Sequence, residues 1–208
     1  MKSKANAVLT ALEELYPEVK CGLEWEGDPY RLLVMAILSA QCTDARVNLV
    51  SKSLFKEFPT VYDMASAPIA DIEEAIRSVG LYRSKAKALK ECCERVATVY
   101  GGKIPSEMEE LLTLRGVGRK VANLLRGDIF GLGGIVADTH CIRIAGRLGL
   151  ADGKDPLKTE RALDLVIPKE KQSDFCHRIV IFGRETCIAR SPKCEDCKLK
   201  EFCEYKRL

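Results

Sequence analysis

Apolar residues recur along the chain at a spacing of three or four, which places them on one face of a helix, and runs of alternating apolar and polar residues are too short to predict a strand. The most apolar segment, residues 30–41, follows Asp28-Pro29, a pair typical of a helix N-cap and first turn. We expect this segment to be a central core helix. The other predicted helices span residues 4–16, 43–56, 68–78, 83–100, 106–114, 119–130, 139–148, 156–166 and 170–184. The pattern predicts an all-α fold.

Two of these helices, 106–114 and 119–130, are separated by the short sequence Gly116-Val117-Gly118. The chain must turn there within three residues, which requires backbone angles that only glycine adopts at little cost. The prediction is a helix-hairpin-helix. Such a hairpin points the free N–H groups of the second helix outward, and a phosphate is the ligand that best fits them.

Arg119 and Lys120 fall in the first turn of that second helix. A cation there opposes the helix dipole and costs about 0.3–1 kcal/mol, so a role other than stability is indicated. Both residues would serve as phosphate contacts. Alternatively, Lys120, desolvated by bound DNA at a helix N-terminus, would act as a nucleophile in its neutral form.

Asp138 also permits two interpretations. It precedes the predicted helix 139–148 directly, where an N-cap belongs, and capping alone would explain it. A Gly-rich loop with Gly131, Gly133 and Gly134 separates it from the helix that carries Lys120. The spacing therefore also permits a lysine and a carboxylate that face one cleft.

The composition describes an ordinary globular protein of 208 residues, 47% hydrophobic and 30% charged, long enough for one sizeable core or two small ones. Its net charge of +3 is too small to indicate a polyanionic partner, so DNA binding would depend on local charge near the hairpin. The candidates for that charge are Arg115, Arg119, Lys120 and Arg126. The N-terminal segment is amphipathic and contains glutamate, so it is expected to be neither a signal peptide nor a membrane span. We expect a cytoplasmic, nucleoid-associated location.

The ten cysteines favour a metal site together with buried thiols over a disulfide framework, because no export signal is recognised. Four of them, Cys187, Cys194, Cys197 and Cys203, follow the pattern C-x6-C-x2-C-x5-C. Four thiolates suit zinc or a [4Fe–4S] cluster, but structural zinc sites usually contain two close pairs and only one is present here. The scattered cysteines are expected to be small core residues: Cys21, Cys42, Cys92, Cys93, Cys141 and Cys176.

The sequence LLTLRGVGRKVANLL, followed by VADTHC, resembles the endonuclease III family of DNA base-excision glycosylases in the helix-hairpin-helix superfamily. The resemblance implies that Lys120 is the nucleophile and Asp138 the catalytic aspartate, and that the cysteine spacing holds a [4Fe–4S] cluster. Arg115 stands where the family usually has proline, and Ala137 where valine is common. Neither difference affects a reacting group.

The resemblance covers essentially the whole chain and implies two helical domains. Residues 22–133 would form a six-helix barrel with the helix-hairpin-helix, and residues 1–21 with 134–208 an iron–sulfur cluster domain. An interdomain DNA-binding cleft would have Lys120 on one wall and Asp138 on the other.

The resemblance also implies DNA contacts. In LSAQCTD (38–44), Gln41 would enter the duplex where the target nucleotide has left, and in SVGLYRSKA (78–86), Leu81 would act as an apolar wedge between bases. An extruded base leaves a hole that costs a few kcal/mol, which two inserted side chains would partly offset. The predicted DNA-binding residues are Gln41, Leu81, Gly116, Gly118, Arg119, Arg190 and Lys193.

The hypothesis that follows is a bifunctional DNA glycosylase with AP lyase activity, which excises oxidised pyrimidines from duplex DNA and cleaves the abasic site by β-elimination. Its partner would be duplex DNA with damaged bases or abasic sites, and a monomer is the simplest expectation. The alternatives are a mismatch glycosylase for adenine or thymine, which normally lacks a lysine at position 120, a non-catalytic DNA-binding module, and a small iron–sulfur electron carrier. His140 and His177 have no spacing that suggests metal binding and are expected to be structural.

Overall fold

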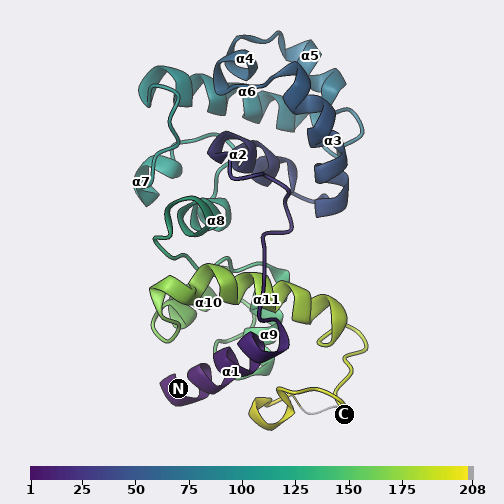
Figure 1. The fold of residues 1–208 in the computed structure, drawn as a ribbon, viewed down its shortest axis with the longest axis vertical. Helices are drawn as coiled ribbons and strands as arrows, with labels where there is room; N and C mark the ends of the chain where they lie inside the picture. The colour runs from purple at the N-terminus through teal and green to yellow at the C-terminus, as the bar shows by residue number, and fades with distance from the viewer. Residues whose placement is uncertain (206–208) are drawn as a thin grey trace. The chain divides into compact units, whose positions relative to one another are not determined.

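The structure is a computed structural model that describes residues 1–205, and its regular elements are eleven α-helices and two short 3-10 helices, with no strand in that range (Figure 1). The predicted all-α fold is confirmed. The chain divides into two compact units. Unit 1 comprises Met1–Cys21 and the chain from Gly131 onward, and unit 2 is Gly22–Phe130. The last three residues of the expected segment 134–208 lie outside the described residues.

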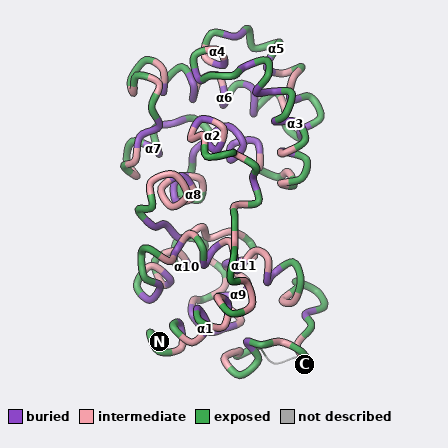
Figure 2. Tube along the Cα trace, viewed as in Figure 1, coloured by how far each residue is buried: buried purple, intermediate pink, exposed green. Residues whose placement is uncertain are grey.

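Unit 2 is built around α2 (Pro29–Leu38), whose residues from Leu32 to Leu38 are all buried (Figure 2). The predicted cap is present, since the Asp28 carboxylate accepts the Tyr30 N–H at 2.9 Å. Helices α3, α6 and α8 pack against α2. The other helices of this unit are α3 (Asp44–Glu57), α4 (Val61–Ser66), α5 (Ile69–Ala75), α6 (Tyr82–Val99), α7 (Met108–Leu111) and α8 (Arg119–Phe130).

Three elements of unit 2 differ from the prediction. Helix α2 ends at Leu38 and not at residue 41, because the chain turns at residues 39–42, where the Cys42 N–H donates to the Ser39 carbonyl at 3.1 Å. Helix α7 spans only four residues of the predicted 106–114. Helix α4 was not predicted, although Thr60 and Asp63 form a capping box at its start.

Unit 1 consists of α1 (Lys2–Leu15), α9 (Thr139–Arg147), α10 (Pro156–Asp164), α11 (Gln172–Glu185) and the 3-10 helices η1 (Lys169–Lys171) and η2 (Lys200–Phe202). Its core packs α11 against α1 and α9, with Phe175 and Phe182 buried at the centre. The buried Arg178 guanidinium donates to the Tyr16 carbonyl at 2.9 Å and so holds the segment that leaves α1. The N-terminal helix therefore packs with the C-terminal third of the chain.

None of the ten cysteines forms a disulfide bond. Cys92, Cys93, Cys141 and Cys176 are buried, as expected for small core residues. The expectation is wrong for Cys21 and Cys42, which are only half-buried because they lie in connecting segments outside the helices. Within residues 1–205, we find no helix of the length and apolar character that a membrane span requires.

In the hairpin between α7 and α8, the backbone comes close to two other helices. Gly116 has φ +82°, and a Cβ atom there would lie 3.2 Å from Ile37 Cγ2 on α2 and 3.3 Å from Ala88 Cβ on α6. Gly118 differs, since a Cβ there would meet no atom within 4 Å. The hairpin backbone thus packs against α2 and α6 at Gly116. Of the two hairpin glycines, only Gly116 has both a left-handed φ and no room for a side chain.

We expect Gly116→Ala to lower the free energy of unfolding by about 2 kcal/mol, because alanine is strained at a left-handed φ and its methyl group crowds Ile37 and Ala88. Gly118→Ala is the matched control and should cost less than about 1 kcal/mol, the scale of an N-cap change. Urea unfolding followed by circular dichroism measures both. Equal losses in the two variants would contradict the assigned role of Gly116.

Candidate active site and cluster site

The hairpin presents three predicted functional residues to solvent. Val117 is buried and its N–H donates to the Leu114 carbonyl at 3.1 Å, so the tip is anchored in the core. Gly118, Arg119 and Lys120 follow, and all three are exposed at the start of α8. The free N–H groups and positive end of α8 thus open toward solvent together with two cations, as an anion site requires.

The flanking cations differ in their surroundings. Arg115, which replaces the usual proline, forms an ion pair with Glu91 at 3.9 Å, and both side chains are exposed. An exposed pair of this kind contributes little to stability. Arg126 lies further along α8 and is half-buried, so among these cations it is the least accessible to a ligand.

Asp138 caps α9, and the cap prediction is confirmed. Its Oδ1 atom accepts the Cys141 N–H at 2.7 Å, while the residue remains only half-buried. A carboxylate at a helix N-terminus is favoured by the helix dipole. The cap fixes the carboxylate in direction and occupies one of its two oxygen atoms.

The loop that leads to Asp138 is held by the Cys176 thiol and by a close glycine contact. The Val136 N–H donates to Cys176 Sγ at 3.2 Å, and a hydrogen bond to Cys176 together with burial raises the pKa of the Cys141 thiol well above its ordinary value. Gly133 has φ +73°, and a Cβ there would lie 2.8 Å from the Lys169 carbonyl oxygen. These contacts attach the loop to α11 and η1, so Asp138 stands on a fixed support.

The two predicted catalytic residues belong to different units. Lys120 is a residue of unit 2 and Asp138 a residue of unit 1. Each is held by its own helix N-terminus, and each unit fixes its residue independently.

The four clustered cysteines line a single cavity in unit 1, whose remaining wall includes Ile144, Leu148, Phe182 and Leu199. All four are half-buried. A cavity with four sulfur donors and an apolar wall fits an iron–sulfur cluster, which takes all-cysteine ligation. The residues present therefore agree with the group that the sequence pattern indicates.

Arg147, at the end of α9, binds both ends of the cysteine loop. Its guanidinium donates to Cys187 Sγ at 3.2 Å and to the carbonyls of Ile188 and Ala189 at 3.0 and 2.8 Å. Its backbone carbonyl lies 3.3 Å from Cys203 Sγ, and its guanidinium stacks on the Tyr205 ring at 4.4 Å. One residue thus contacts the first and the last cysteine of the motif.

Arg143, one turn earlier on α9, donates to the Cys187 carbonyl at 3.0 Å and to the Gly183 carbonyl at 3.2 Å. The same guanidinium lies 3.1 Å from Nδ1 of His140, which gives this histidine a structural contact as expected. Sequence reasoning missed Arg143 and Arg147 as supports of the cysteine loop. Their spacing of four on the helix next to the motif was the available signal.

The loop between Cys187 and Cys194 carries the predicted phosphate contacts Arg190 and Lys193, both exposed. The Lys193 N–H donates to the Thr186 carbonyl at 2.9 Å and closes the loop at its base. The loop is therefore ordered by protein hydrogen bonds on both sides and displays two cations.

Gln41 and Leu81 are both exposed in unit 2, and the exposed fraction of Leu81 is 60%. Gln41 lies in the turn after α2, and Leu81 is the N-cap residue of α6. Both have left-handed backbones, with φ of 53° and 60°. Neither side chain is part of the core.

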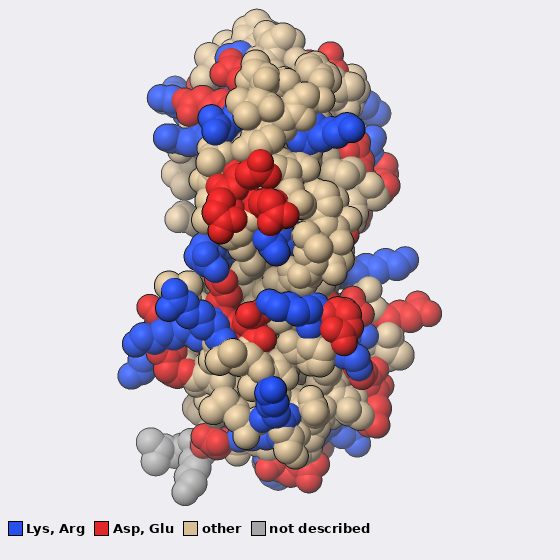
Figure 3. Space-filling model, turned by 90° about the vertical axis from the view of Figure 1, so that its left-hand side faces the viewer, with Lys and Arg blue, Asp and Glu red and all other residues tan. Residues whose placement is uncertain are grey.

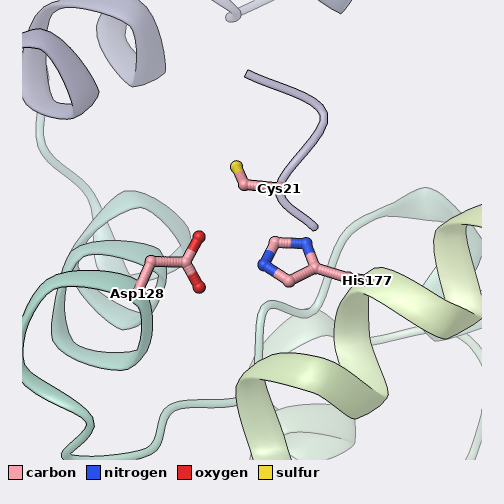
Figure 4. A group of neighbouring side chains, drawn as sticks. All are labelled: Cys21, Asp128 and His177. Atoms are coloured by element: carbon pink, nitrogen blue, oxygen red, sulfur yellow. The ribbon is translucent and has the colours of Figure 1, made fainter. Parts of the chain in front are cut away.

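A cysteine and a histidine of unit 1 also lie close together. Figure 4 labels Cys21, in the segment after α1, and His177, on α11, and their Sγ and ring-nitrogen atoms are within 4.8 Å of one another. Asp128, the third residue labelled there, belongs to α8 of unit 2. Two ligands from one unit are too few for a structural metal site.

Charge is distributed without a single dominant sign. On the face drawn in Figure 3, Lys and Arg side chains stand beside Asp and Glu side chains on each unit. This agrees with the small net charge of +3. Any anion-binding function must therefore come from local features such as the α8 N-terminus.

The chain matches known proteins over nearly its whole length. Residues 34–169 match the HhH-GPD superfamily of base excision DNA repair proteins, and residues 187–203 match the iron–sulfur binding domain of endonuclease III. Endonuclease III of Synechocystis sp. is 42% identical over 97% of this chain and 92% of the relative. The chain belongs to the endonuclease III family. As a member of this family, it is a DNA N-glycosylase and AP lyase of base excision repair that carries a [4Fe–4S] cluster.

Solved structures agree with this assignment. A trapped endonuclease III–DNA covalent intermediate is 40% identical, with a TM-score of 0.92 over 98% of this chain and 96% of that one. A thermostable thymine-DNA glycosylase is 25% identical, with a TM-score of 0.88. The resemblance found in the sequence is therefore confirmed, and the endonuclease III likeness is the stronger of these two in sequence and in fold.

We expect Arg147→Met to accelerate loss of the cluster roughly 10-fold, because partners that orient metal ligands are typically worth that much in metal affinity. Decay of the visible cluster absorbance in the presence of an iron chelator measures the rate. Arg161→Met, which removes an arginine from the exposed side of α10, is the control and should leave the rate unchanged. Equal rates in both variants would show that Arg147 does not support the cluster.

Proposed function

We propose that this member of the endonuclease III family excises oxidised pyrimidines from duplex DNA with Lys120 as nucleophile and Asp138 as the assisting carboxylate. The observation that carries the assignment of Lys120 is its exposed position in the first turn of α8, directly after the glycine hairpin. The 40% identical solved structure is a trapped covalent endonuclease III–DNA intermediate, and a covalent bond to DNA supports a nucleophilic residue in this family.

Access to the damaged nucleotide requires its extrusion from the duplex, because the sugar carbon and base edge are otherwise shielded. Leu81 would insert between the exposed neighbouring bases, and Gln41 would fill the space that the nucleotide leaves. Their exposure in unit 2 supports this role. The hairpin residues Gly116, Gly118 and Arg119 would bind a backbone phosphate through free N–H groups and charge.

The neutral amine of Lys120 attacks C1′ of the sugar and forms a C–N bond. The bond between C1′ and the base breaks, and the base leaves with the electron pair and takes up a proton. Asp138 stabilises the positive charge that develops on the sugar and assists proton transfer. Its capping bond uses Oδ1, so the second oxygen of the carboxylate is the one available to the sugar.

Ring opening of the sugar gives a Schiff base between Lys120 and C1′. The cationic nitrogen acidifies the hydrogen at C2′, which is lost to a base. The electron pair forms a double bond between C2′ and C3′, and the bond from C3′ to its phosphate oxygen breaks. Water then releases the unsaturated sugar from Lys120. The strand is cut on the 3′ side by β-elimination.

We assign Cys187, Cys194, Cys197 and Cys203 as the cluster ligands, supported by their common cavity. When bound, the [4Fe–4S] cluster supplies a covalent crosslink between the two ends of the loop. Arg190 and Lys193 would contact a DNA phosphate from the stiff loop between the first two ligands. Arg147 and Arg143 keep that loop in place through their bonds to its carbonyls.

The proposed domains have nearly the same bounds as the two observed units. Residues 22–133 would be the six-helix barrel with the helix-hairpin-helix, and residues 1–21 with 134–208 the cluster domain. A cleft between these domains would bring Lys120 and Asp138 to the same nucleotide. A cytoplasmic, nucleoid-associated monomer agrees with a substrate that is chromosomal DNA.

The substrate assignment is tested by incision of three duplexes, which carry thymine glycol, an abasic site, or A opposite G. We expect cleavage of the first two and none of the third, because the lyase step requires Lys120 and the pocket would accept a damaged pyrimidine. Cleavage of the third duplex alone, and only after alkali, would favour a mismatch adenine glycosylase instead.

We expect Lys120→Ala to abolish borohydride trapping of the protein on the abasic duplex, because the Schiff base needs the lysine amine. Denaturing gel electrophoresis of the reduced reaction measures the adduct. Arg119→Ala is the control, since it removes an exposed cation from the same helix turn but leaves the amine. Persistent trapping in Lys120→Ala would remove this residue from its role.

Two variants separate the capping role of Asp138 from the role of its charge. An asparagine at this position would still cap α9, so Asp138→Asn should change the free energy of unfolding by less than about 0.5 kcal/mol, whereas Asp138→Ala should cost about 1 kcal/mol. Excision of thymine glycol should fall at least about 100-fold in both, because both lose the carboxylate charge. Single-turnover incision and urea unfolding measure the two effects. Full activity in Asp138→Asn would leave only the structural role.

A further inference from the structure

Two strained residues mark the surface of unit 2 that is proposed to enter DNA. Among residues 1–205, positive φ outside glycine occurs at Glu26, Gln41 and Leu81. A side chain in this region costs on the order of 1–2 kcal/mol, and it persists only where the surrounding structure enforces it. Gly80 precedes Leu81 and would adopt a left-handed backbone at little cost, yet the left-handed residue is Leu81. The strain therefore falls on the exposed leucine.

Lys85 connects the segments that carry these two residues. It lies on α6 with an exposed fraction of only 5%. Its Nζ atom donates to the Leu38 carbonyl at 2.9 Å, and its backbone N–H donates to the Leu81 carbonyl at 3.0 Å. Leu38 is the last residue of α2, three residues before Gln41. Lys85 thus bonds through its side chain to the segment that leads to Gln41, and through its backbone to Leu81.

The turn that contains Gln41 has hydrogen bonds of its own. It is closed internally, by the Cys42 N–H to the Ser39 carbonyl at 3.1 Å and by the Ser39 hydroxyl to the Ala36 carbonyl at 2.8 Å. These bonds shape the turn but do not tie it to α6. The Lys85 bond does so, and it also satisfies a carbonyl at the end of α2 that has no partner within the helix.

Burial of the Lys85 ammonium group has a high desolvation cost, although its side chain satisfies only one carbonyl. Burial lowers the pKa of Lys85 below its ordinary value, so the charged form is held against a desolvation cost. Lys90, on the same helix, provides a comparison. Its Nζ donates to the carbonyls of Ala65 and Ala67, both at 2.9 Å, at the end of α4 and in the following residue. Two lysines of one helix thus tie helix ends, but only Lys85 reaches the strained segments.

We propose that Lys85 is a positioning residue that holds Gln41 and Leu81 at a fixed separation, so that both side chains enter the duplex together. The proposal rests on the proposed function, because it needs these two residues to contact DNA. Preorganisation of this kind removes part of the ordering cost from the binding step. Lys85 acts through Gln41 and Leu81 and contacts no reacting atom.

A double-mutant cycle tests the proposal with two probes, a duplex that carries a tetrahydrofuran abasic analogue and the matched undamaged duplex. The variants are Lys85→Met, Gln41→Ala with Leu81→Ala, and all three changes together. We expect Lys85→Met to weaken binding of the analogue duplex about 10-fold, a loss of about 1.4 kcal/mol, with little change for undamaged DNA. In the background without Gln41 and Leu81, the same substitution should cost less than about twofold, because nothing remains for Lys85 to position.

Lys90→Met is the matched control, since it removes a carbonyl contact of the same kind from the same helix. It should lower the free energy of unfolding without changing the preference for the analogue duplex. If Lys85→Met does not fold, Lys85→Gln replaces it in the same cycle, because its amide is shorter and uncharged and holds the Leu38 carbonyl less well. Urea unfolding of each variant establishes that binding is measured on folded protein.

Three outcomes would overturn the proposal, and they separate it from the proposed function. A loss that is the same in both backgrounds, or a loss equal to that of Lys90→Met, would assign Lys85 to stability alone and leave the DNA contacts intact. If the Gln41 and Leu81 variant bound both duplexes like the wild type, the two proposed contacts would fail, and the role of Lys85 with them. Retained borohydride trapping by Lys120 in that case would show that the catalytic assignment survives.

Discussion

The backbone groups that helices leave unpaired at their ends determine where this protein can place function. Lys120 stands in the first turn of α8, Asp138 caps α9, and Leu81 precedes α6. Gln41 follows the end of α2, and Cys187 follows the end of α11. Helix N-termini attract anions and orient carboxylates, and helix C-termini need donors. The proposed phosphate site, the fixed carboxylate and the proposed ligand loop of this all-α chain therefore all depend on the same property of its backbone.

Much of this arrangement could be predicted from local sequence. Asp28 and Asp138 are caps in the sequence and in the structure, and the glycine hairpin is where the pattern predicts it. Local signals were weaker where short elements are held by distant contacts. Helix α4 is six residues long and packs on α6, and its capping box was its only local sign. Helix α2 ends early because the turn at 39–42 competes with the helix, and sequence periodicity does not report such a competition.

In the candidate site as well, some features could be predicted from local sequence and others depend on distant contacts. The cysteine spacing and the hairpin are local patterns, so sequence and resemblance lead to them directly. The roles of Arg143, Arg147 and Lys85 arise from bonds to residues about forty positions away in the sequence, such as Arg147 to Cys187 and Lys85 to Leu38. The spacing of four between Arg143 and Arg147 is a weak signal, because ordinary helix-surface cations share it. Only the folded chain identifies the three residues as supports for the loops that carry the proposed DNA contacts.

The packing of α1 against α11 has a consequence for synthesis of the chain. Helix α1 leaves the ribosome before its packing partner α11, which emerges more than a hundred residues later. Unit 2 is a continuous segment and can fold in the interval, whereas the apolar face of α1 has to wait. The cysteine loop, which packs against the same core as α1, is made later still. Until then the apolar face of α1 stays exposed on the growing polypeptide, where chaperones can bind it.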